Sequence, residues 1–327
     1  MKKVDVHEAV GKTLATDVTI IEGLNKSVLF KRGHKISQDD IPKLLSIGRH
    51  YVWIEDNGSP FVHEDDAGRF IMEAIKGENL DITEPEESKV KLVAKQNGIL
   101  LVNSEGLFKI NEIGDIVVAT KKPFAFVKQG TPVSIGKIMP KEISPDVLSK
   151  VENVANAYRP IIDLKPIVTH KVALFPVGNE FIEGLREEVL SVRVKEYLES
   201  LGQEVIMREI LPDDDLKIKD AGLKALNDGA DIVIYMGGMA VDPDDRTVAG
   251  IKLMGVEVVK YGIPIFPGFT FLISYFGEKV ILGVPSGMGI VRENTSFTFL
   301  MPIILSNYKL TRDTLIKFSL GGYLNFE

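Results

Sequence analysis

From Val168 onward, short apolar runs alternate with longer amphipathic stretches. The apolar runs predict strands, and they cover residues 172–175, 205–210, 231–236, 256–261 and 279–284. The stretches between and after them predict helices at 185–201, at 216–228, from about 245, and at 295–305. This alternation predicts an α/β domain: a three-layer structure with a mostly parallel sheet and helices on both faces.

The first half of the chain has a different pattern, in which short apolar runs are separated by Gly, Asn and charged residues. These runs predict strands at 89–94, 99–102, 116–119, 124–127 and 133–138. Two helices are expected, one capped by Ser37 and closed by Gly48, the other running from Glu64 to Lys76.

These patterns predict two domains with a boundary near residue 165. Residues 1–165 would form a β-rich α+β domain, and residues 166–327 would form the α/β domain. The acidic segment 81–88 has a proline and no apolar periodicity, so a surface loop or linker near 80–88 would divide the first domain into two subdomains. Further breaks are expected at 140–145 and 159–166.

Composition narrows the class of protein. A chain of 327 residues is long enough for two domains, and 45% hydrophobic and 26% charged residues are typical of a soluble globular protein. There is no uncharged apolar run of the ~18 residues that a membrane helix needs, and no secretory signal at the start, so we expect a cytoplasmic protein that does not bind a membrane. Because cysteine is absent, any chemistry must use oxygen and nitrogen groups.

The charge distribution argues against a nucleic-acid partner. The net charge is −7, and residues 166–327 carry 16 Lys and Arg against 22 Asp and Glu. Nucleic-acid binders usually show a basic excess, because neutralising phosphates dominates their affinity. We therefore expect a small-molecule ligand.

Four loops follow predicted strands of the α/β domain, where open sheets bind their ligands. They are 176–180, 211–215, 237–247 and 283–287. We expect all four to gather at one edge of the sheet. Gly237 and Gly238 would let backbone N–H groups approach a phosphate, although the same pair can simply make a tight turn.

These loops also carry six aspartates, namely Asp213, Asp214, Asp215, Asp242, Asp244 and Asp245. Carboxylates of this kind can hold Mg²⁺, but they also cap helices and form turns. Helix capping explains one aspartate in each loop, so six aspartates are more than capping alone requires. The sequence has no P-loop, no dinucleotide fingerprint, no G-x-S-x-G elbow and no histidine pair at metal-ligand spacing.

The loop sequence GGMAVDPDDRT at 237–247 resembles the GGxS-x-D-P-D-D-x-T-P signature of the molybdopterin-binding proteins of molybdenum cofactor biosynthesis. Similar matches are PVGNEFIEG from Pro176, the P-D-D loop at 212–214, YGIPIFPG from Tyr261, and GVPSG from Gly283. The N-terminal patterns FKRGHKI from Phe30, DDIPKLL from Asp39, and His63-Glu64 are similar to those of a bacterial subgroup with an N-terminal β-rich domain.

This resemblance implies that the α/β domain binds molybdopterin or adenylylated molybdopterin together with Mg²⁺, with molybdate insertion as the activity. It implies a homodimer as a further expectation. Asp214 and Asp245 would be the catalytic and metal-binding carboxylates. The other implied cofactor-binding residues are Gly178, Asn179, Glu180, Asp213, Gly237, Gly238, Met239, Ala240, Asp242, Asp244, Arg246, Thr247, Pro285, Ser286 and Gly287.

The departures from the family pattern favour a different class of function. Val177 stands where Thr or Ser is usual, Ala240 replaces the signature Ser, and Ser286 replaces Gly. Losing such contacts would make the protein a catalytically degenerate carrier or sensor that still binds the pterin. A third reading is a nucleotide-processing enzyme on the same fold, although the amidase domain usual in those relatives has no counterpart in this sequence.

Overall fold

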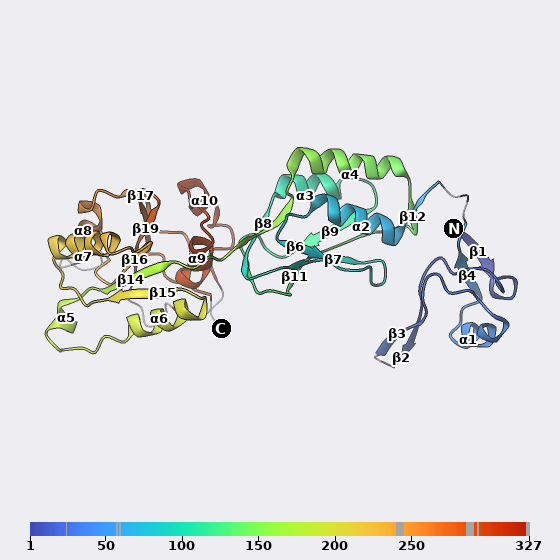
Figure 1. Cartoon of the computed structure of the whole chain (residues 1–327), viewed down its shortest axis with the longest axis horizontal. Coiled ribbons are helices and arrows are strands. Elements are labelled where there is room, and N and C mark those ends of the chain that lie inside the picture. The colour runs from blue at the N-terminus through green and yellow to red at the C-terminus, as the bar shows by residue number, and fades with distance from the viewer. Residues whose placement is uncertain are drawn as a thin grey trace. The chain divides into compact units, whose positions relative to one another are not determined.

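The computed structural model of the chain describes residues 1–23, 25–56, 58, 60–239, 245–285, 291–292 and 294–324 (Figure 1). It contains two compact units. Unit 1 comprises residues 1–93, 102–121 and 132–163, and unit 2 comprises residues 94–101, 122–131 and 164–327. Two short segments from the first half of the sequence therefore belong to unit 2.

The first part of unit 1 is a small α+β assembly. Its strands pair antiparallel as β1 with β4 and β2 with β3. The elements are β1 (Lys2–Asp5), η1 (Val6–Glu8), β2 (Val18–Glu22), β3 (Asn25–Phe30), η2 (Gln38–Asp40), α1 (Ile41–Ser46) and β4 (Tyr51–Ile54). Buried Val6, Leu14 and Leu44 belong to its apolar cluster. The helix expected after Ser37 starts as the 3-10 turn η2, where the Asp40 carboxylate accepts hydrogen bonds from the backbone and hydroxyl of Ser37.

The rest of unit 1 has a four-stranded sheet in the order β6-β7-β11-β9. Its elements are β5 (Val62–His63), α2 (Glu64–Ile75), β6 (Leu80–Ile82), β7 (Val90–Ala94), α3 (Ser104–Asn111), β9 (Ile116–Thr120), β11 (Pro132–Ile138), β12 (Glu142–Ile143) and α4 (Pro145–Tyr158). Two sequence interpretations are shifted at their ends. The expected loop at 81–88 starts after β6, at residue 83. The expected break at 140–145 contains β12 and ends where Pro145 begins α4, because a proline suits the first turn of a helix.

A three-stranded sheet in the order β10-β8-β13 lies mostly in unit 2, although Val102, Ile162 and Asp163 at the strand ends belong to unit 1. Its strands are β8 (Gly98–Val102), β10 (Phe126–Val127) and β13 (Ile162–Pro166). The expected break at 159–166 is thus largely a strand. Ile99 of β8 is fully buried in the same apolar cluster as Phe297 and Leu300 of α9 (Ser296–Leu305), which explains why this early segment folds with the C-terminal part of the chain.

The main sheet of unit 2 has six strands in the order β15-β14-β16-β19-β18-β17. They are β14 (Lys171–Pro176), β15 (Glu204–Arg208), β16 (Ile232–Met236), β17 (Glu257–Tyr261), β18 (Leu272–Phe276) and β19 (Lys279–Val284). The first four strands in the sheet order are parallel, β18 is antiparallel to both of its neighbours, and β17 again runs in the direction of the first four. The predicted α/β fold class is therefore confirmed, although the sequence pattern missed β18.

Helices cover both faces of this sheet (Figure 1). The helices are α5 (Asn179–Ile182), α6 (Leu190–Ser200), α7 (Asp215–Asn227), α8 (Thr247–Leu253), α9 and α10 (Arg312–Lys317). Alternate residues of β14 point to opposite faces, so Leu174 shares a cluster with α6 and α9, while Phe175 shares one with α7 and α8. Burial on both faces explains the continuous apolar runs of the central strands.

No helix of the described residues is both long enough and apolar enough to cross a membrane.

Candidate functional site

The carboxyl ends of the four parallel strands lie at one edge of the main sheet of unit 2, which we call the carboxyl edge. The first two loops are bonded to one another there. The backbone N–H of Asn179 donates to Asp213 Oδ2 at 2.9 Å, and the backbone N–H of Asp213 donates to Asn179 Oδ1 at 3.2 Å. A bridge between Val177 and Leu211 lies just before this pair. The predicted meeting of these two loops is thus observed.

The third loop is anchored to the fourth at its start. The N–H of Gly237 donates to the carbonyl of Val284 at 3.0 Å. Gly237 and Gly238 have φ values of +95° and +59°, which favour glycine. Thr247, the buried first residue of α8, closes the turn: its hydroxyl donates to the Gly237 carbonyl at 2.7 Å and its N–H to the Gly238 carbonyl at 3.0 Å. The glycine pair therefore has a defined conformation.

A Cβ at either of two glycines of the carboxyl edge would force a neighbouring side chain to move. A Cβ on Gly238 would lie 2.5 Å from Thr247 Oγ1 and 3.3 Å from Asp213 Oδ1, so the second and third loops meet at this residue. A Cβ on Gly178 would lie 2.4 Å from Glu180 Oε2. Bare backbone at these positions is what close approach to an anionic ligand requires.

The carboxylates have different local roles. Asp214 caps α7, since its Oδ1 accepts the backbone N–H groups of Leu216 and Lys217 at 2.9 and 3.0 Å. Asp215 Oδ1 lies 3.9 Å from Arg246 Nε. The alternative reading of Asp214 as a helix cap is therefore correct in part, and its Oδ2 accepts no hydrogen bond from a described residue.

Asp245 acts electrostatically on Tyr261. Burial raises the pKa of the Tyr261 hydroxyl, and the negative charge of Asp245 raises it further. That hydroxyl donates to the Met239 carbonyl at 2.5 Å. In the family pattern, Tyr261 is only the first residue of the segment YGIPIFPG. In the structure, its hydrogen bond to Met239 holds the start of the third loop. The Met239 side chain is buried in the apolar cluster against Gly283.

A three-ligand metal cluster is not formed within the described ranges: no group of three or more His, Asp or Glu side chains there could hold a metal ion. Of the predicted site residues, Ala240, Asp242, Asp244, Ser286 and Gly287 lie outside these ranges. Pro285 is half-buried directly after β19. A small cavity of about 30 Å³ lies beside Pro176 and Met236, which is room for a water molecule.

Family models match both ends of the chain. The one described as "Probable molybdopterin binding domain" covers residues 173–305. A second, described as "Domain of unknown function (DUF8806)", covers residues 3–56. The main part of unit 2 is therefore similar to this family of probable molybdopterin-binding domains.

A curated relative is similar over part of the same region. The molybdopterin adenylyltransferase of Pyrococcus furiosus is 30% identical over 94 residues, which are 29% of this chain and 55% of the relative. The chain thus spans about half the length of the curated relative it matches.

Two solved structures are each similar to less than half of this chain. One is the tungsten cofactor synthesizing protein MoaB from Pyrococcus furiosus (20% identity, TM-score 0.37), with 44% of this chain and 98% of that chain covered. The other is the protein CinA with unknown function from Thermoplasma acidophilum (20% identity, TM-score 0.36), with 42% and 98% covered.

Val177 does not face the carboxyl edge. Its side chain is 2% exposed and belongs to the apolar cluster that contains Phe175 and Leu211. The sequence interpretation of this position as a lost ligand-facing hydroxyl therefore differs from the structure, in which the side chain contributes to the core.

We expect Val177→Thr to lower the free energy of unfolding by about 1–3 kcal/mol, because it places a hydroxyl in apolar surroundings. Urea unfolding followed by circular dichroism would measure the loss. Val192→Thr is the control, since Val192 is 39% exposed and should change stability by less than ~0.5 kcal/mol. If Val177→Thr were as stable as the native protein, the burial of the Val177 side chain in the apolar core would be contradicted.

Proposed function

We propose that unit 2 binds molybdopterin or adenylylated molybdopterin at the carboxyl edge and acts in molybdenum cofactor biosynthesis. The observation that carries the proposal is the Gly237-Gly238 turn, which Thr247 holds and which meets Asp213 of the neighbouring loop. Such a turn suits the phosphate of an anionic pterin, because the N–H of Gly238 can approach it closely, whereas the N–H of Gly237 donates to the Val284 carbonyl. The family-model match supports the pterin as the ligand class.

Each neighbouring side chain has a proposed role in this binding. Arg246 is exposed and partly balanced by Asp215, so it can turn toward a bound phosphate. Asp214 and Asp245 would hold Mg²⁺, which would neutralise phosphate charge when bound. The described residues form no three-ligand cluster, so oxygen atoms of the pterin ligand, or Asp242 and Asp244 outside the described ranges, would complete that site.

The proposed activity is insertion of molybdate into the bound pterin. In this activity, the protein's own residues hold the anionic part of the ligand and keep it at the open edge of the sheet, where molybdate has access. A homodimer is also part of the proposal, on the family resemblance alone.

A second candidate function is a carrier or sensor that binds the pterin without turnover. The sequence favours it at Ala240, which stands where the family signature has a Ser hydroxyl. Val177 does not count toward this reading, because its side chain lies in the core and not at the carboxyl edge.

Calorimetric titration of the purified protein tests the binding. Molybdopterin and its adenylylated form are titrated with and without Mg²⁺, into the native protein and into Asp245→Ala. We expect binding that Mg²⁺ strengthens and that Asp245→Ala weakens by about tenfold or more. The matched control is Asp228→Ala, at the exposed C-terminal end of α7, which should bind like the native protein.

The same samples separate the two candidate functions. Formation of molybdenum cofactor from adenylylated molybdopterin and molybdate supports insertion, and binding without product supports the carrier. If neither pterin binds the folded protein, the proposed function is wrong in both forms.

A further inference from the structure

Unit 1 contains a cavity of about 920 Å³, at the upper end of the range that is usual for small-molecule sites. Most of its lining residues are charged, with seven Lys and Arg side chains and seven Asp and Glu side chains. We call it the charged cavity. A lining of this kind suits a hydrophilic ligand with ionic groups.

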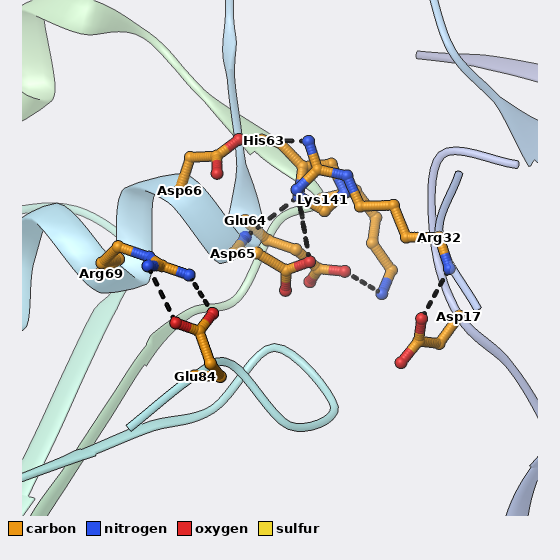
Figure 2. Close-up of polar contacts among 9 residues, drawn as sticks. All are labelled: Asp17, Arg32, His63, Glu64, Asp65, Asp66, Arg69, Glu84 and Lys141. Carbon is orange, nitrogen blue, oxygen red and sulfur yellow. Dashed lines mark hydrogen bonds and ion pairs between the residues drawn. The ribbon is translucent and has the colours of Figure 1, made fainter. Parts of the chain in front are cut away.

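Most acidic groups of the charged cavity already have cationic partners (Figure 2). Arg32 reaches from the segment after β3 to the first turn of α2, where its guanidinium nitrogens lie 3.4 Å from Asp65 Oδ2 and 3.1 Å from Asp66 Oδ2. Arg69 pairs with Glu84 through two contacts. These carboxylates therefore already form ion pairs with cationic side chains of the protein itself.

The cationic groups are not all balanced in this way. Among the described residues, Lys31, Arg49 and Lys137 line the charged cavity without an ion pair. The lining as a whole has equal numbers of basic and acidic side chains, but these three cations have no carboxylate partner in the described ranges and can bind an anionic group of a ligand.

Glu64 has a cationic partner but differs from the other carboxylates in its burial. It is the first residue of α2, 1% exposed, and it lines the charged cavity. Its Oε1 lies 2.7 Å from Lys141 Nζ, but its Oε2 is buried without a hydrogen-bond partner (Figure 2). Buried carboxylate oxygens are costly to leave unpaired, so this atom indicates a missing donor.

Lys31, Arg32 and His63-Glu64 belong to sequence patterns that the function of unit 2 does not use. His63 Nδ1 accepts the backbone N–H of Asp65 at 3.1 Å, so a neutral ring carries its proton on Nε2, and this buried nitrogen also has no partner. His63 lines a second cavity of about 220 Å³, and Arg32 lines both cavities.

We propose that the charged cavity binds a phosphorylated small molecule that carries a hydroxyl group. The phosphate contacts the unpaired cations Lys31, Arg49 and Lys137. The hydroxyl donates to Glu64 Oε2. This site lies wholly in unit 1 and is separate from the carboxyl edge of unit 2.

Calorimetric titration of the full chain with three probes tests this site. The probes are ribose 5-phosphate, inorganic phosphate and ribose. We expect ribose 5-phosphate to bind at one site, phosphate to bind two- to tenfold more weakly because it makes fewer contacts with Glu64, and ribose not to bind. Absence of saturable ribose 5-phosphate binding up to about 10 mM, or equal affinity for phosphate, would overturn the proposal.

Two variants assign the binding to named groups. Lys137→Gln should weaken ribose 5-phosphate about tenfold, whereas Lys150→Gln, an exposed position on α4, should leave it unchanged. In Glu64→Gln, Lys141 keeps the amide oxygen, so the amide NH₂ faces the cavity and the preference for ribose 5-phosphate over phosphate should disappear. Unchanged binding in Lys137→Gln would overturn the site.

The two sites are distinguishable in the same titrations. Lys137→Gln should bind molybdopterin as the native protein does, and Asp245→Ala should keep its affinity for ribose 5-phosphate. Loss of ribose 5-phosphate binding in Asp245→Ala would count against a separate site in unit 1.

Discussion

Replacement of Phe175 by alanine is expected to lower the free energy of unfolding of unit 2 by about 3–5 kcal/mol. Phe175 is fully buried at the centre of the six-stranded sheet, and its ring stacks on Tyr235 at a centroid distance of 5.4 Å. The substitution removes this contact and leaves a cavity between β14, β16 and the helices α7 and α8. Urea unfolding monitored by circular dichroism measures the change.

Phe276→Ala is the matched control for this prediction. Phe276 is the last residue of β18 and is 39% exposed, so its truncation removes less buried area and should cost clearly less. The two aromatic truncations then differ only in burial. A Phe175→Ala loss below about 1 kcal/mol would show that this core is not packed as described.

Replacement of Gly238 by alanine is expected to weaken molybdopterin binding by at least tenfold. The added Cβ would lie 2.5 Å from Thr247 Oγ1, the atom that holds the Gly237 carbonyl, and φ at this residue is +59°. The glycine turn must therefore shift, which moves the N–H of Gly238 away from the ligand. Calorimetric titration with molybdopterin measures the loss.

Gly229→Ala separates this effect from backbone strain in general. Gly229 also has a positive φ, +98°, but a Cβ there meets nothing within 4 Å, and the residue follows α7 at its C-terminal end. Both variants should lose about 1–2 kcal/mol of stability from the left-handed conformation. If both bind molybdopterin equally well, the glycine turn is not the phosphate site.

Much of unit 2 could be predicted because its signal is local. Its central strands, such as β14 and β16, are buried on both faces and appear as unbroken apolar runs, and the helices between them show one apolar face. The meeting of the loops at 176–180 and 211–215 followed from parallel strand direction alone. β18 was missed because the prediction relied on strands that alternate with helices. β18 instead lies between β17 and β19 in the sheet and runs antiparallel to both.

Unit 1 was less predictable because its elements depend on distant contacts. The helix α4 starts at Pro145, and its buried residues Leu148, Val151 and Ala155 give only a narrow apolar stripe. The strand β6 has three residues, too few for a periodic signal. The charged cavity combines side chains from segments more than 70 residues apart, such as Glu64 and Lys141, and no local pattern contains that information.

The sequence by itself determined the α/β class of unit 2, the loops at its carboxyl edge and the resemblance to molybdopterin-binding domains, because strand burial, helix periodicity and short loop motifs are local properties of the chain. The tertiary structure alone decided that residues 94–101 and 122–131 fold with unit 2, that Val177 points into the core, and that Asp214 caps α7. It also placed a buried, unpaired Glu64 oxygen beside a cavity. These features depend on which distant side chains come into contact, and burial and pairing exist only once they do.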